Sequence, residues 1–231
     1  MEVTPEMFWG LFFISIIITF VAQMLVKSRY NKYKQIPNNK GMTGQAVARN
    51  ILDQNGLYNV QITMVNRELG DNYNPTNKTV NLSPEVFGGS SIASLAIAAH
   101  ECGHAIQDKE KYGFMRLRLG LVPVLNAAST LSYISIFAGL LLGYGTVIYI
   151  GIAVQFISLL FELVTLPVEF DASARALKQL SNFNMFTGDE VSGAKSMLKA
   201  AALTYVGALL TTLVQLLRLL LIVQNSRGRR R

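Results

Sequence analysis

Histidine, cysteine and charge are all scarce in this sequence. The 231 residues include two histidines and one cysteine, and only 15% are charged. A single cysteine cannot build an internal disulfide framework, so nothing in the chain requires an oxidising compartment. The low charge, combined with 51% hydrophobic residues, excludes an ordinary soluble enzyme. The composition therefore predicts a membrane protein.

The net charge of +7 comes from basic residues that lie beside apolar runs. Lys27, Arg29, Lys32 and Lys34, for example, directly follow the first apolar run. Basic clusters in such places bind anionic lipid headgroups. No basic stretch is expected to be interleaved with exposed aromatic residues, so we predict the lipid bilayer and no nucleic acid as a partner.

Four apolar runs are long enough to cross a bilayer as helices: residues 8–26, 119–142, 144–166 and 200–223. The first follows acidic residues and precedes basic ones, which predicts an uncleaved anchor with its N-terminus outside and the next segment in the cytoplasm. The second and third are separated at Gly143, which predicts a tight helical hairpin. The last could span or lie in the interface, because spanning would place the C-terminal arginines outside.

Residues 30–118 are mixed and polar, which predicts a small cytoplasmic module. Thr43 can cap a helix over residues 45–52 that Asn55-Gly56 would end. Residues 60–65 alternate as a strand does and residues 78–82 predict its partner, so we expect these two to form a β-hairpin. The hairpin could pair with an extended substrate or only pack on the helix that follows.

Both histidines fall in one motif, His100-Glu101-Cys102-Gly103-His104, where a helix is predicted from Ile92 to about Gln107. One helical turn separates His100 from His104, so both imidazoles can reach one metal ion, with Glu101 on the adjoining side. Chance placement of these three residues would give this spacing on the order of once in a few thousand sequences. The motif predicts a Zn²⁺ hydrolase with Glu101 as its catalytic base.

A catalytic zinc usually takes three protein ligands. Cys102 lies two residues from His100 and points to the opposite side of the helix, so the third ligand should be a carboxylate. Glu169 is favoured, because it follows Pro167 at the cytoplasmic end of the third apolar run, the level at which a membrane-anchored zinc helix would present its histidines. Asp171 is the alternative. Other downstream carboxylates are Glu162, Asp189 and Glu190.

Together with Glu169-Phe170-Asp171-Ala172-Ser173-Ala174-Arg175, the histidine motif resembles the YugP family of bacterial membrane zinc metallopeptidases, which has an HtpX-like layout. The resemblance covers nearly the whole chain. It implies that His100, His104 and Glu169 are the zinc ligands and Glu101 the base. In the HtpX-like group an Asp follows the glutamate ligand by four residues, whereas this chain has Ser173 there.

These features predict a mainly α integral membrane protein with a zincin-like zinc helix, a small β-hairpin and three to four transmembrane helices. Its expected segments are an N-terminal transmembrane anchor, a cytoplasmic zinc-helix module, a transmembrane helical hairpin, a cytoplasmic segment with the third ligand, and a C-terminal membrane helix with a basic tail. The anchor covers residues 1–29, the zinc-helix module 30–118 and the helical hairpin 119–166. The cytoplasmic segment covers residues 167–199, and the C-terminal helix with its tail covers 200–231.

The predicted function is that of a zinc endopeptidase in a bacterial plasma membrane, with its active site on the cytoplasmic side. Its substrates would be peptides or membrane proteins; the oligomeric state stays open. Arg175, Tyr112 and Tyr205 are candidate oxyanion donors. The alternatives are a zinc hydrolase for other substrates, and a non-catalytic metal-binding scaffold or transporter with an intramembrane Glu162–Arg218 ion pair.

Overall fold

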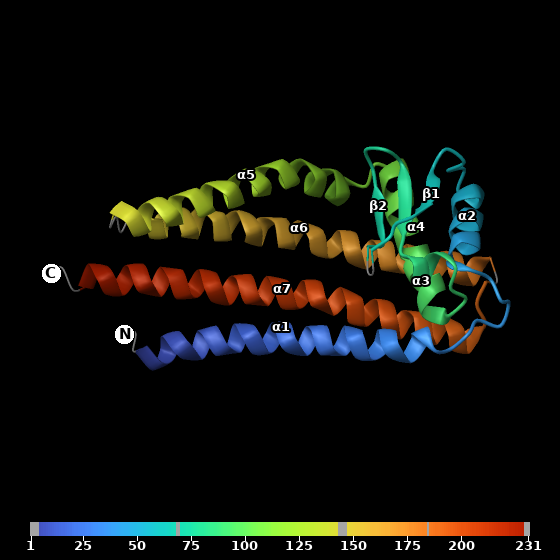
Figure 1. The fold of residues 1–231 in the computed structure, drawn as a ribbon, viewed down its shortest axis with the longest axis horizontal. Coiled ribbons are helices and arrows are strands. Elements are labelled where there is room, and N and C mark those ends of the chain that lie inside the picture. Colours follow the sequence, from blue (N-terminus) through green and yellow to red (C-terminus); the bar gives the residue numbers. More distant parts are fainter. Residues whose placement is uncertain (1–4, 68–69, 143–146, 184, 229–231) are drawn as a thin grey trace. The chain divides into compact units, whose positions relative to one another are not determined.

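A computed structural model describes residues 5–67, 70–142, 147–183 and 185–228 (Figure 1). Helices dominate, as predicted, and the fold class of a mainly α membrane protein is confirmed. The elements in chain order are α1 (Pro5–Lys34), α2 (Gly44–Gln54), β1 (Gln61–Met64), β2 (Asn72–Asn74), β3 (Thr79–Leu82), α3 (Pro84–Phe87), α4 (Ile92–Lys109), α5 (Gly113–Leu142), α6 (Val147–Asn182) and α7 (Gly188–Gly228).

Three helical stretches in the described part of the chain are long and apolar enough to cross a membrane. They are Trp9–Lys34, Tyr149–Asn182 and Gly188–Leu221, with mean hydropathies of 2.2, 1.9 and 1.7. The last covers residues 200–221 of the run whose spanning was left open by the charge pattern. The tight turn expected at Gly143 and the last three arginines of the basic tail lie outside the described residues.

The chain forms two compact units. The first comprises Met1–Gln23, Leu117–Leu166 and Thr204–Arg231, and the second comprises Met24–Arg116 and Pro167–Leu203. The division into five segments made from the sequence stays a prediction. The second unit holds all residues of the histidine motif and also Glu169.

Within the first unit, side-chain hydrogen bonds join apolar helices. Thr212 of α7 donates to Oε1 of Glu162 in α6 at 2.8 Å, and Gln155 donates to Gln215 at 2.6 Å. Polar side chains on apolar helices are stable when they are paired with one another in this way. Thr212 and Gln215 of α7 thus face another helix of this unit, α6.

In the second unit, α2 packs against α4. The Thr43 hydroxyl accepts a hydrogen bond from the Ala46 amide at 3.2 Å and caps α2, as predicted. After α2, Gly56 adopts a left-handed φ of +67°, which suits a residue without Cβ. Val47 and Ile51 of α2 are fully buried in the core, as is Leu95 of α4. The histidine motif is therefore on a helix that the core holds in place.

The small sheet has the strand order β1-β3-β2. β2 and β3 form an antiparallel hairpin, with Tyr73 opposite Val80. The prediction that residues 60–65 and 78–82 pair as a hairpin was wrong, because β1 and β3 run parallel. The chain leaves β1, forms β2 at the far edge and returns as β3 between them. No strand was predicted at β2, which lies between the two predicted strands in the sequence.

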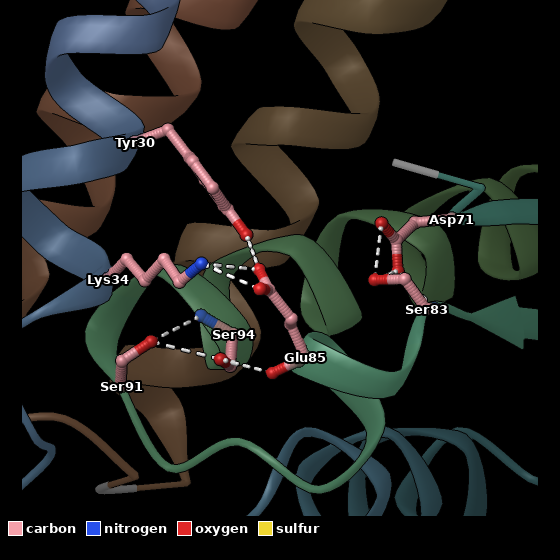
Figure 2. A network of polar contacts seen from close by, with 7 residues as sticks. All are labelled: Tyr30, Lys34, Asp71, Ser83, Glu85, Ser91 and Ser94. Atoms are coloured by element: carbon pink, nitrogen blue, oxygen red, sulfur yellow. Dashed lines mark hydrogen bonds and ion pairs between the residues drawn. The ribbon is translucent and has the colours of Figure 1, made fainter. Parts of the chain in front are cut away.

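A polar network holds the end of α1 to α3 (Figure 2). Glu85 of α3 accepts hydrogen bonds from Tyr30 at 2.8 Å and from Lys34 at 2.7 Å. The backbone oxygen of Glu85 accepts from the Ser94 hydroxyl in the first turn of α4, at 3.0 Å. The C-terminal end of α1 is thereby tied to the start of the helix with the histidine motif.

Helices α4 and α6 approach closely at Gly103. A Cβ added to Gly103 would lie 2.5 Å from the backbone oxygen of Ala172, closer than real Cβ contacts come. Glycine at this position therefore lets the two backbones touch. The contact lies between the two histidines on α4 and three residues after Glu169 on α6.

We expect Gly103→Ala to destabilise the protein by about 1–3 kcal/mol, because the added methyl must push α6 away. The measurement is thermal unfolding of detergent-solubilised protein in the presence of a chelator, so that metal binding does not contribute. Gly113→Ala is the matched control, since no atom lies within 4 Å of a Cβ added there. Equal unfolding temperatures of the two variants would contradict this account of the helix contact.

Candidate metal centre

The structure brings His100, His104 and Glu169 together. The two imidazole rings lie 4.8 Å apart between centroids, one turn apart on α4. Oε2 of Glu169 lies 3.3 Å from Nε2 of His100 and 3.6 Å from Nε2 of His104. The potential ligand atoms of the three residues all lie within 4.8 Å of one another.

This cluster fits a zinc ion by its chemistry and its burial. Two imidazole nitrogens and one carboxylate oxygen are a ligand set that catalytic zinc takes in proteins. The Glu169 side chain is only 3% exposed, so its charge needs a partner inside the protein. Both Nε2 atoms point at the same carboxylate oxygen, as nitrogens that share one cation with it would.

Glu101 is buried beside the cluster. Its Oε2 accepts a hydrogen bond from the backbone amide of Tyr73 in β2, at 2.9 Å. Burial raises the pKa of the Glu101 carboxyl, and the nearby charges of His100 and His104 oppose that rise. A carboxyl group with a raised pKa, held by one hydrogen bond, is suited to taking up and releasing a proton.

Strand β2 is anchored to α4 beside Glu101. The Tyr73 hydroxyl donates to the Asp108 carboxylate of α4 at 2.6 Å, and the Lys78 ammonium forms an ion pair with the same carboxylate. Tyr73 lies opposite Val80 of β3, yet its amide points to Glu101. In an antiparallel pair, a residue whose amide faces away from its partner presents its carbonyl to the same open edge. This edge of β2 therefore faces the side of Glu101.

Two contacts to the histidines were not predicted from the sequence. Ser173 Oγ lies 3.2 Å from Nδ1 of His100, and Gln107 Oε1 lies 3.0 Å from Nδ1 of His104. Helical spacing was the available signal, because Gln107 is three residues after His104 and Ser173 is four residues after Glu169. Ser173 thus contacts a candidate ligand from the place where the HtpX-like group has an Asp.

Asp171, the alternative third ligand, faces other partners. Its Oδ2 accepts hydrogen bonds from Gln107 at 2.8 Å and from Arg175 at 2.5 Å. Arg175, named from the sequence as a possible oxyanion donor, also forms an ion pair with Glu110 at 2.6 Å. The guanidinium is therefore engaged by two carboxylates. Asp171 and Arg175 form a polar link beside the cluster and are not members of it.

Two of the other downstream carboxylates, Glu162 and Glu190, bind other partners. Glu162 belongs to the first unit, where it accepts the hydrogen bond from Thr212. Glu190 caps α7, because its carboxylate accepts from the Thr187 amide and from the Asn39 amide, both at 2.7 Å. Neither belongs to the group formed by the two histidines and Glu169.

Cys102 is fully buried on the other side of α4, as predicted. Its thiol lies 3.6 Å from the backbone oxygen of Ala48 in α2. Burial raises the pKa of this thiol, so it stays protonated near neutral pH and is a poor metal ligand. The side chain fills space between α2 and α4.

Comparisons with known proteins agree with the resemblance stated from the motifs. The profile of a family described as "Putative neutral zinc metallopeptidase" matches residues 8–224. The chain is also 42% identical over 210 residues to "Putative membrane protease YugP" of Bacillus subtilis, covering 91% of this chain and 93% of that protein. No solved structure matches the chain significantly.

Proposed function

Because the chain belongs to the neutral zinc metallopeptidase family whose profile it matches, we propose that it is a membrane-embedded, zinc-dependent endopeptidase. Its substrates would be peptide bonds of membrane or membrane-proximal proteins. The observation that carries this proposal is the convergence of two imidazoles and one carboxylate beside a second, buried carboxyl group.

His100, His104 and Glu169 would hold the ion. A zinc ion held there supplies Lewis acidity, which polarises a substrate carbonyl and makes water nucleophilic near neutral pH. The three side chains are at most 16% exposed, so bulk water is kept from weakening these interactions.

Glu101 would act as the general base. It would take a proton from the attacking water and pass it to the leaving amine. The Tyr73 amide holds the carboxylate from β2, which limits the directions in which Glu101 can turn. Because burial opposes a free carboxylate, Glu101 gains a proton more readily than an exposed glutamate does.

The open edge of β2 would guide the substrate backbone. An extended peptide that adds to this edge would run past Glu101, and its backbone could hydrogen-bond the carbonyl of Tyr73. The anchoring of Tyr73 through its hydroxyl to Asp108 keeps the strand in place for such pairing.

The proposed site faces the cytoplasm. Glu169 lies on α6, a helix long and apolar enough to cross the membrane, and the second unit begins at the basic end of α1. Basic residues flanking a span favour the cytoplasmic side, which supports substrates at the inner surface of a bacterial plasma membrane. The lipid bilayer is therefore the expected surroundings of both enzyme and substrate.

The first test is Glu101→Gln. This change should keep zinc bound at wild-type stoichiometry and lower hydrolysis at least about 100-fold, because only the proton acceptor is lost. Zinc content is measured on purified protein, and hydrolysis by quantitative proteomics of membranes from cells with each variant. Glu85→Gln is the control, since it alters an exposed carboxylate whose partners are Tyr30 and Lys34 and not the residues of the cluster. Equal cleavage by Glu101→Gln and wild type would refute the role of Glu101 as general base. Absence of bound metal in purified wild-type protein would refute the proposal that the chain is a zinc-dependent enzyme.

The second test separates the two carboxylates considered as third ligand. Glu169→Ala should abolish stoichiometric zinc binding, whereas Asp171→Ala should still bind one zinc ion when zinc is saturating. The reason is that only Glu169 reaches both imidazoles. Metal content is measured by elemental analysis, with circular dichroism to verify that each variant is helical. An unchanged zinc content in Glu169→Ala would exclude Glu169 as a zinc ligand.

A further inference from the structure

Gln107 is fully buried and contacts residues on both sides of the site. Its amide nitrogen donates to the backbone oxygen of Val168 at 2.8 Å and to Oδ2 of Asp171 at 2.8 Å. A backbone carbonyl can only accept, and an aspartate paired with Arg175 can likewise only accept. The orientation of the Gln107 amide is therefore determined by two independent partners.

This orientation decides the tautomer of His104. With its nitrogen facing Val168 and Asp171, Gln107 turns its amide oxygen toward Nδ1 of His104, 3.0 Å away. An amide oxygen only accepts, so Nδ1 must carry the hydrogen. In a neutral imidazole the lone pair then lies on Nε2, the atom that faces Glu169.

The contact at His100 has no such consequence. Ser173 can either donate to Nδ1 or accept from it, because a hydroxyl does both. The two histidines thus differ. The amide oxygen of Gln107 fixes the tautomer of His104, whereas the hydroxyl of Ser173 does not fix that of His100. Gln107 also holds the backbone oxygen of the residue directly before Glu169, so one side chain acts on two candidate ligands.

We propose that Gln107 is a positioning residue for the metal centre, which fixes the tautomer of His104 and ties the zinc helix to the segment that carries Glu169. The inference rests on the proposed function, because it concerns how the same cluster is prepared to bind zinc. Partners of this kind, which hold a metal-binding histidine through its second nitrogen, typically contribute 10–100-fold to metal affinity.

The experiment measures zinc affinity by competition with a chromogenic chelator. Gln107→Met should weaken binding about 10–100-fold, because it keeps the length of the side chain and removes both hydrogen-bonding groups. Gln179→Met is the matched control. Gln179 lies in α6, and its side-chain oxygen accepts a hydrogen bond from Asn55 at 3.1 Å. Among the described residues, no hydrogen bond joins Gln179 to His100 or His104. Its zinc affinity should equal that of wild type.

A charge-conserving rescue separates positioning from simple loss of structure. Gln107→Glu keeps an acceptor for His104 but places a carboxylate against Asp171 and should also weaken zinc about 10–100-fold. Adding Asp171→Asn supplies an amide that can donate to the new carboxylate at unchanged net charge. The double variant should bind zinc more tightly than Gln107→Glu alone but less tightly than wild type, because a carboxylate at position 107 cannot donate to the Val168 oxygen. Asp171→Asn alone should not exceed wild type.

Cobalt substitution adds a spectroscopic reading of the site itself. The visible absorption of bound Co²⁺ should change in Gln107→Met and stay unchanged in Gln179→Met, because only the former alters a ligand's orientation. Wild-type zinc affinity in Gln107→Met, or an unrescued double variant, would overturn the inference while leaving the proposed function intact. Failure of wild-type protein to bind zinc would instead overturn the proposed function, and the inference with it.

Discussion

The close contact between α4 and α6 is the constraint on which the site depends. Gly103 has no side chain to separate the helices, and the backbone of Ala172 occupies the space where one would be. Because His100 and His104 flank Gly103 on one helix and Glu169 precedes Ala172 on the other, the same contact brings the imidazoles to the carboxylate. A wider helix separation would move the carboxylate out of reach of both rings.

A second constraint places the base. Glu101 is buried, and a buried carboxyl group needs a hydrogen-bond partner. The Tyr73 amide provides it, and this is possible only because β2 is held to α4 through Asp108. Just before β2, Asp71 accepts from the Ser83 amide at 2.8 Å, which ties the start of the strand to the start of α3. The short strand is thus held beside the site at its start and at its central residue, Tyr73.

The local features of the second unit could be predicted from the sequence, whereas its pairings could not. Alternation in residues 60–65 indicates a strand but carries no information on the direction of its partner, so the parallel pairing of β1 with β3 was missed. The three residues of β2 include two asparagines, which are poor strand formers, and its pairing comes from the neighbouring strand and helix.

The same distinction holds for the site. The i, i+4 spacing of the histidines follows from helix geometry, and Glu169 was favoured by its place after an apolar run. Both are local patterns. The contact of Gln107 with Val168 joins residues 61 positions apart, and no pattern within α4 or α6 alone contains it. A polar residue one turn after a histidine ligand is the one signal that could have pointed to Gln107.

The residues that contact the candidate ligands determine the net charge of the proposed site. The ligand set carries one negative charge, from Glu169, and its immediate neighbours Gln107 and Ser173 are neutral. The charge of Asp171 is met by Arg175, which is itself shared with Glu110. A divalent cation in the cluster would therefore keep a net positive charge. Positive charge in a buried place favours the deprotonated form of nearby acids, so it would counteract the burial that raises the pKa of Glu101 and return that carboxyl toward the form a base requires.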